Sequence, residues 1–269
     1  MPIIGSRRAI LPGGVRDADA LAYAAAAYAA GAPVSSNRFN LFSALSYNLK
    51  AVGAWPALDR LWLYTAEDAT KPAQALIDLK ARATATAVNA PILTANRGYL
   101  FNGTSSYLDT GFNPSIAGGN FARTDSCFGV WVVTAPLVPG AAEIGNDYGG
   151  YSVMRVYNNT TQRLVQINAV TNASAAPLHN NNLTGCFHME RTSETTEAMY
   201  RNGVQEWAGT DGTRQIPNDT FYVGAVDTSS VPGYWSTAQI GAAWMGKHLP
   251  DQAGFYNVLR TFMTAVGVP

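Results

Sequence analysis

The stretch Glu197–Gly209, EAMYRNGVQEWAG, decides the local fold because an Asn-Gly pair stands at its centre. A two-residue hairpin turn needs positive φ at both central positions, which Asn tolerates and Gly adopts freely. Asn202-Gly203 therefore predicts two antiparallel strands joined by a tight turn. The pairing that this turn predicts is Arg201 with Val204, Tyr200 with Gln205, Met199 with Glu206, and Ala198 with Trp207.

Similar short runs fill the chain after about residue 58. They include RGYLFNG, SSYLDTG, SCFGVWVVTA, YSVMRVYN, QRLVQINAV, GCFHMERT, DTFYVGAV and AQIGAAWMG. Clusters of Gly, Asn, Pro or Thr separate them at fairly even intervals. Many short strands with polar turns are typical of a two-sheet sandwich or jelly roll.

Helical patterns stand at the two ends of the chain. The segment DADALAYAAAAYAAGAP predicts a helix that Asp17 or Asp19 caps, and SSNRFNLFSALSYNLKAVGAW predicts a second one that begins at Ser35 or Ser36. Near the C-terminus, Asp251 can cap a helix with an apolar stripe formed by Phe255, Val258, Leu259, Phe262 and Val266. We therefore divide the chain into an N-terminal helical anchoring segment, residues 1–57, and a β domain, residues 58–269.

The order of these pieces resembles a known family. RGYLFNGTSSYLDTGFNP, then CFGVWVV, YRNGVQ, TFYVGAV and AQIGAAWMGKHLPDQAGFYNVL is similar to laminin-G-like, concanavalin A-like jelly rolls. The resemblance implies an all-β, antiparallel two-sheet sandwich with a short N-terminal helical segment and a C-terminal helix. The segment before it resembles the lead-in of such domains in tailed-phage or prophage structural proteins, which implies a virion component.

Composition excludes some classes of function. Of the 269 residues, 47% are hydrophobic and 13% are charged, and the formal net charge is zero. A neutral chain has no general attraction to nucleic acid or anionic membrane, and no apolar run is long enough to insert into a membrane. Cys127 and Cys186 lie in strand-like apolar runs, where we expect buried free thiols, with a disulfide as the alternative.

Catalytic patterns are weak. Retaining glycosidases need two carboxyl groups about 5 Å apart, commonly on alternating strand positions. Glu143 with Asp147, and Glu194 with Glu197, are interpreted as solvated pairs. His179, His188 and His248 lack the spacing of zinc ligands, and we interpret His188 as a core or edge residue. On these grounds the sequence predicts that the protein is not an enzyme.

A calcium ion is the one cofactor that the resemblance implies. Laminin-G-like domains often hold Ca²⁺ at the sandwich rim, and oxygen ligands could come from Asp109, Asn146, Asp147 or Asp227. The loop GNDYGG is the best local candidate because its glycines let carbonyl groups turn inward. The alternative is that Asn146 and Asp147 only build an Asx-type turn, in which case no cofactor is expected.

Carbohydrate is the ligand that the fold class suggests. Sugar sites combine an aromatic face with polar partners for the hydroxyl groups. This pattern appears at Tyr148 and Tyr151 beside Asn146 and Asp147, and at Tyr234 and Trp235 in the loop SSVPGYWST. The alternative is that these rings pack beneath a loop or at a subunit interface. Trp131, Trp207 and Trp244 lie inside strand runs and are expected in the core.

The leading hypothesis is a non-enzymatic bacteriophage virion protein of the tail, baseplate or fibre apparatus. Its jelly roll would attach the particle to host-surface glycan, and its N-terminal helices would anchor it to other virion proteins. We expect a homo-oligomer, assembled in the cytoplasm of the bacterial host, with no nucleic-acid partner. The alternatives are a capsid decoration protein, a plain assembly scaffold of the same fold, and a polysaccharide-cleaving depolymerase.

Overall fold

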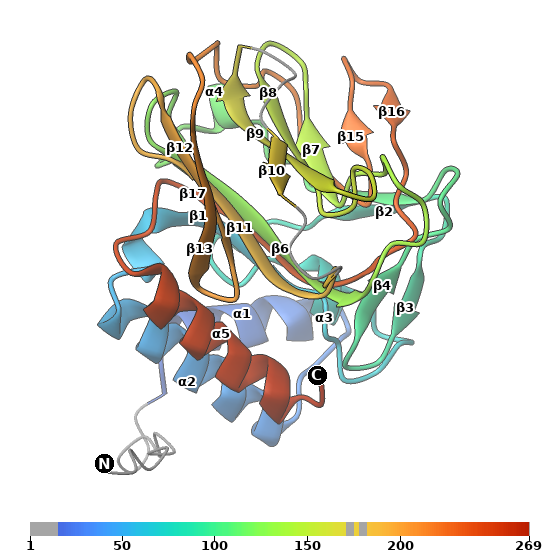
Figure 1. Ribbon diagram of the computed structural model, residues 1–269. Helices are drawn as coiled ribbons and strands as arrows, with labels where there is room; N and C mark the ends of the chain where they lie inside the picture. The colour runs from blue at the N-terminus through green and yellow to red at the C-terminus, as the bar shows by residue number, and fades with distance from the viewer. Residues whose placement is uncertain (1–15, 171–174, 178–181, 269) are drawn as a thin grey trace, which may run out of the picture.

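The computed structural model describes residues 16–170, 175–177 and 182–268, and His179 lies outside them. Its elements form three layers (Figure 1). Helices α1 (Ala18–Ala29), α2 (Ser36–Ala51) and α5 (Gln252–Ala265) make one outer layer. A central sheet lies between these helices and an outer sheet. Short helical turns occur at η1 (Trp55–Ala57), α3 (Ala73–Leu76) and α4 (Pro114–Ala117).

The central sheet is 8-stranded, and its strands pair antiparallel. Strand β17 is its pivot, since it pairs with β6 along one edge and with both β1 and β4 along the other. The order is β13 (Val204–Thr210), β12 (Thr196–Arg201), β11 (Gly185–Arg191), β6 (Ser126–Thr134), β17 (Gln239–Gly246), β4 (Gly98–Leu100) and β3 (Ile92–Thr94), with β1 (Leu58–Leu63) beside β17.

The outer sheet is 9-stranded and antiparallel except where β15 meets β7. Its order is β10 (Ala175–Pro177), β9 (Gln162–Ala169), β8 (Tyr151–Arg155), β7 (Ile144–Asn146), β14 (Tyr222–Val223), β5 (Tyr107–Asp109) and β2 (Thr86–Val88), with β15 (Val226–Asp227) paired to β7 and to β16 (Pro232–Gly233). The chain thus forms the two-sheet sandwich with terminal helices that the sequence predicts, and this prediction is confirmed.

The main core fills the space between the sheets. Alternate residues of the long central strands point into it, as the period of two requires. Phe128 and Val130 of β6 meet Ile144, Met154 and Val165 of the outer sheet there, all at most 1% exposed. The intervening residues Gly145, Val153, Arg155 and Leu164 therefore belong to the opposite side of the outer sheet, which we call the outer face.

A second core joins the helices to the other side of the central sheet. The predicted caps are present, since Asp17, Ser35 and Asp251 each accept a hydrogen bond from the first turn of their helix. Phe42 of α2 stacks on Phe262 of α5 with the ring centroids 5.5 Å apart. The buried apolar residues of α2 thus pack against α5 and the sheet of the same protein; they are Phe39, Phe42, Leu45 and Leu49. The division of domains at residue 58 stays a prediction.

The hairpin at Asn202-Gly203 is confirmed, with one error in its pairing. Arg201 faces Val204 and Tyr200 faces Gln205, but a bulge then pairs Met199 with Trp207. The bulge adds one residue to β13 and so turns Trp207 toward the face of Met199, where Trp207 packs against the main core.

Other predictions concern buried groups and the membrane. Cys127 and Cys186 are buried free thiols, as predicted. His188 is 3% exposed, and its Nδ1 accepts a hydrogen bond from Nε1 of Trp244 at 3.0 Å. In the part of the chain that the structure describes, no helix is sufficiently long and apolar to cross a bilayer.

Candidate functional site

Asn146 ends β7, and its side chain is buried. Its Nδ2 donates to the carbonyl groups of Asp219 at 2.6 Å and Thr220 at 3.1 Å, and its Oδ1 accepts the N–H of Tyr148 at 2.9 Å. The last bond is the Asx-type turn that the sequence allows. Asn146 therefore ties the loop 147–150 to the segment before β14. Contact with a ligand or metal stays a prediction for this residue.

Asp147 is half-buried beside this turn, and its N–H donates to the carbonyl of Asp227 at 2.9 Å. Burial raises the pKa of the Asp147 carboxyl, while the positive charge of Arg155 opposes the rise. Arg155 belongs to the outer face of β8. The positive charge of the Arg155 guanidinium thus acts on the Asp147 carboxylate.

Tyr234 and Trp235 follow β16 and cross the start of β7. The N–H of Ala142 donates to the carbonyl of Tyr234 at 2.8 Å, and Ala142 forms a parallel bridge with Trp235. Tyr234 has a φ of 56° and is 49% exposed. The guanidinium carbon of Arg155 lies 4.0 Å from the centroid of its ring. Arg155 thus contacts Tyr234, and its charge also acts on Asp147, which lies toward the other end of β7. The sequence had placed Tyr234 and Asp147 in separate loops.

Trp235, the next residue in the chain, is half-buried. It packs against Tyr107 and Tyr222, whose ring centroids are 4.5 Å apart. Its Nε1 is buried and has no hydrogen-bond partner among the residues that the structure describes. The two loop aromatics therefore differ: the ring of Tyr234 is exposed, and Trp235 packs against the tyrosines of the outer face.

Tyr148 and Tyr151 lie against the segment 214–218. Tyr148 is 44% exposed, and its carbonyl accepts the N–H of Asn218 at 2.9 Å. The guanidinium carbon of Arg214 lies 5.5 Å from the centroid of the Tyr151 ring. Arg214 and Tyr151 thus form a second arginine–tyrosine pair at the N-terminal end of β8, whereas Arg155 lies at its C-terminal end.

Asp109 is separated from the predicted metal ligands Asn146 and Asp147, although its negative charge contributes to the raised pKa of Asp227. It pairs with Tyr222, which in turn pairs with Gly145, so two strand spacings of about 4.8 Å separate Asp109 from β7. Within the described ranges, no group of three or more His, Cys, Asp or Glu side chains is arranged to hold a metal ion. Binding of calcium therefore stays a prediction from the resemblance.

Two carboxyl groups beside the outer face have strongly raised pKa values. Burial, together with the negative charge of Asp219, raises the pKa of Asp227 to about 7. Burial also raises the pKa of Glu143 to about 7. Oε2 of Glu143 accepts the N–H of Val156 at 2.7 Å, and Oε1 accepts the hydroxyl of Ser236 at 3.0 Å. The Glu143 carboxyl thus holds the segment 225–236, which carries Tyr234, against the sheet, whereas the Asp227 carboxyl accepts the N–H of Ser230 within that segment at 2.6 Å.

The interpretation of the carboxylate pairs as solvated is wrong for two members. Glu143 is fully buried, and Glu197 is 1% exposed and forms an ion pair with Arg191 at 3.1 Å. Glu194 does face solvent and pairs with Arg123 at 2.6 Å. The sequence did not show this burial because the partners Val156 and Ser236 of Glu143 come from other segments, and the partner of Glu197 comes from the neighbouring strand β11.

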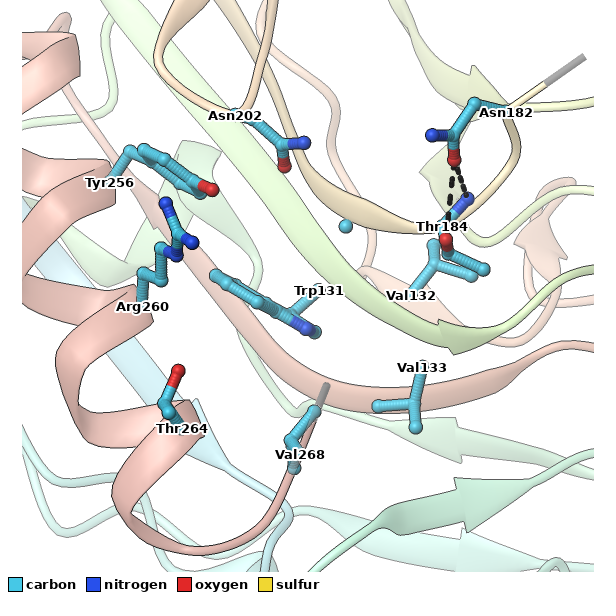
Figure 2. A pocket seen from close by; sticks show the side chains of 11 residues that line it. Trp131, Val132, Val133, Asn182, Thr184, Asn202, Tyr256, Arg260, Thr264 and Val268 are labelled. Atoms are coloured by element: carbon cyan, nitrogen blue, oxygen red, sulfur yellow. Dashed lines mark hydrogen bonds between the residues drawn. The ribbon is translucent and has the colours of Figure 1, made fainter.

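The sequence also missed a cavity of about 420 Å³ between α5 and the central sheet (Figure 2). Trp131 of β6 and Tyr256 of α5 form one wall, with their rings stacked at a centroid distance of 6.0 Å. The guanidinium carbon of Arg260 lies 5.9 Å from the centroid of the Tyr256 ring. The full lining is Trp131, Val132, Val133, Asn182, Thr184, Gly185, Asn202, Tyr256, Arg260, Thr264 and Val268.

The Asn-Gly turn closes one side of this cavity. Asn202 is fixed to the start of β11, because its N–H donates to the carbonyl of Cys186 at 2.8 Å and its Oδ1 accepts the N–H of Cys186 at 2.9 Å. Gly203 sits against α5, where a Cβ would lie 3.0 Å from Ala253 and Tyr256. Tyr256 and Arg260, four residues apart on α5, are the sequence signal that could have indicated this wall.

Comparisons with known proteins support the fold. No family model matches the chain, and no curated protein matches it. Among solved structures, a Trypanosoma rangeli sialidase in complex with 2,3-difluorosialic acid is 12% identical, with a TM-score of 0.50 over 86% of this chain and 40% of that one. Domain 4 of an extracellular arabinanase from Geobacillus stearothermophilus, in complex with arabinotriose, is 11% identical over 75% of this chain and 97% of that one, with a TM-score of 0.45.

These likenesses correct one prediction and leave others open. The prediction that the protein is not an enzyme is contradicted, because the chains of similar fold include a sialidase. At 12% identity the likeness concerns the fold, and the chain spans about 40% of the sialidase. The bacteriophage and virion context stays a prediction from the sequence resemblance.

Proposed function

We propose that this protein is a β-sandwich that binds carbohydrate on the outer face of its outer sheet, around Tyr234. One observation carries the proposal: Tyr234 is 49% exposed, and the guanidinium of Arg155 lies 4.0 Å from its ring centroid. An exposed aromatic ring can stack on the apolar face of a sugar, and adjacent charged groups can bond its hydroxyl groups. Arg155 supplies donors beside this ring, and Asp147, on which the charge of Arg155 acts, can supply acceptors to a ligand that extends along β7.

The backbone around Tyr234 is also held in place, which suits a binding role. Its backbone is fixed by the bond from Ala142, and the Glu143 to Ser236 bond holds the segment that follows. A ligand-contacting ring that is already ordered loses little conformational entropy on binding. A similar fold occurs in a sialidase in complex with 2,3-difluorosialic acid, and this likeness supports the proposal.

The wider proposal places this binding in a bacteriophage virion. The protein would sit in the tail, baseplate or fibre apparatus as a homo-oligomer and attach the particle to a host-surface glycan. This part rests on the resemblance of the sequence to phage structural proteins. Immunogold labelling of purified particles tests it, because label on the capsid would favour a decoration protein, and no label would contradict a virion role.

A glycan array, followed by titration of the best ligand, tests the binding itself. Tyr234→Ala should weaken the affinity by at least about tenfold, since aromatic platforms contribute strongly to binding. Tyr28→Ala is the matched control, because Tyr28 is 74% exposed on α1 at the opposite side of the molecule. No array signal, or equal loss in both variants, would contradict the proposal. The same mixtures should be assayed for new reducing ends, which detects cleavage if it occurs.

A further inference from the structure

The cavity between α5 and the central sheet has the polar character of an anion site. Among the described residues, its lining contains one charged side chain, Arg260, and no carboxylate. No ion pair of Arg260 is found within residues 16–170, 175–177 and 182–268. A guanidinium is always charged and has the planar geometry that matches a carboxylate. An unpaired arginine at the mouth of a cavity is therefore a ready partner for an anionic ligand.

The amide side chains of the lining strengthen this bias toward donors. Oδ1 of Asn202 is engaged by the N–H of Cys186 at 2.9 Å. Oδ1 of Asn182 accepts from the N–H and the hydroxyl of Thr184, both at 3.2 Å (Figure 2). Both amide acceptors are thus used internally, and among the described residues neither Nδ2 group has an acceptor, which leaves these groups as donors for a ligand. Nε1 of Trp131, a residue only 3% exposed, is a further donor without a described partner.

The size and the walls of the cavity define the body of the ligand. A volume of about 420 Å³ lies within the range of roughly 300–1,000 Å³ that small-molecule sites occupy. Tyr256 and Trp131 offer an aromatic wall, and Val133 and Val268 offer an apolar one. Such walls suit a ring of moderate size, and the donors suit a carboxylate attached to it.

We propose that this cavity binds a carboxylate-bearing sugar, with Arg260 as the partner of the carboxylate. The carboxylate follows from the charges and donors of the lining, and the sugar body rests on the proposed carbohydrate-binding function. This second site lies on the helix side of the central sheet, opposite the outer face that carries Tyr234. The two sites can therefore be disabled separately.

Calorimetric titration of the full chain with sodium glucuronate and with glucose tests the proposal. The two sugars share a ring and differ in the carboxylate. We expect glucuronate to bind at least about tenfold more tightly than glucose, and Arg260→Gln to remove that difference. Because Arg260 is exposed on α5, this variant should fold normally.

Further variants sharpen the test. Thr264→Phe fills the cavity from an exposed position of α5 without changing its charge, and should also weaken glucuronate binding. Arg123→Gln, an exposed position outside both proposed sites, should leave it unchanged. Failure of glucuronate to bind the wild-type chain, or equal binding by Arg260→Gln, would overturn the inference. Loss in the outer-face variant Arg155→Gln with retention in Arg260→Gln would also overturn it, and would instead place the acidic sugar at the proposed outer-face site.

Discussion

Glu143→Gln should make the protein more stable at pH 8 and remove part of its pH dependence. Glu143 is fully buried, and burial raises its pKa from 4.5 to about 7. Since one pKa unit corresponds to about 1.4 kcal/mol, keeping this carboxylate ionised in the folded state costs about 3 kcal/mol. Between pH 4.5 and about 7 the folded state retains a proton that the unfolded state has lost. The free energy of unfolding therefore falls as the pH rises through this window.

Glutamine is a close mimic of the protonated side chain. Its carbonyl oxygen can still accept the N–H of Val156, and its amide can donate to the hydroxyl of Ser236. That hydroxyl keeps its bond from the N–H of Ala238 at 2.9 Å. The variant should thus preserve the packing and remove only the ionisation.

Urea denaturation of the wild type and Glu143→Gln between pH 4.5 and 8.5 measures the effect. The difference in unfolding free energy should rise by about 3 kcal/mol across the window and then level off. Some pH dependence should persist in the variant, because the pKa of Asp227 is also raised to about 7. Glu194→Gln, at an exposed position, is the control and should give only a small difference. If Glu143→Gln behaves like this control, or is less stable than the wild type at pH 8, the reasoning is refuted.

Two further predictions concern packing and are measured by urea denaturation at a single pH. Phe42→Ala should lower the free energy of unfolding by about 3–5 kcal/mol, because Phe42 is 2% exposed and stacks on Phe262. The control Tyr47→Ala, at a position of the same helix that is 51% exposed, should lower it by less than about 0.5 kcal/mol. Equal losses in the two variants would contradict the packing of α2 on α5. Gly203→Ala should cost roughly 1 kcal/mol or more, since its φ is 75° and a Cβ would lie 3.0 Å from Ala253; Gly233→Ala, with no atom within 4 Å of its Cβ position, should be nearly neutral, so a neutral Gly203→Ala would argue against the turn docking on α5.

Local chemistry made the elements predictable. The caps Asp17, Ser35 and Asp251 and the Asn202-Gly203 turn each act within a few residues, and the structure contains all of them. The alternation of short apolar runs was sufficient to predict two facing sheets. The bulge opposite Met199 was not predictable, because either register leaves a plausible pattern and packing of Trp207 decides between them.

The candidate sites depend on contacts that the sequence does not contain. The hydrogen-bond donors to the Glu143 carboxylate come from Val156 and Ser236, which are 13 and 93 residues away. Tyr234 and Asp147 were recognised as separate candidates. Arg155 was not recognised, although its guanidinium lies against the Tyr234 ring and its charge acts on Asp147. The cavity escaped notice because Trp131 on a strand looks like any core residue until α5 is placed over it.

The central claim is that carbohydrate binds on the outer face around Tyr234, and a structure of the complex tests it most directly. A crystal soaked with the best array ligand should show a sugar ring against Tyr234, with hydroxyl groups near Arg155 and Asp147. A ligand bound elsewhere, with the Tyr234 ring bare in the same crystal, would contradict the claim.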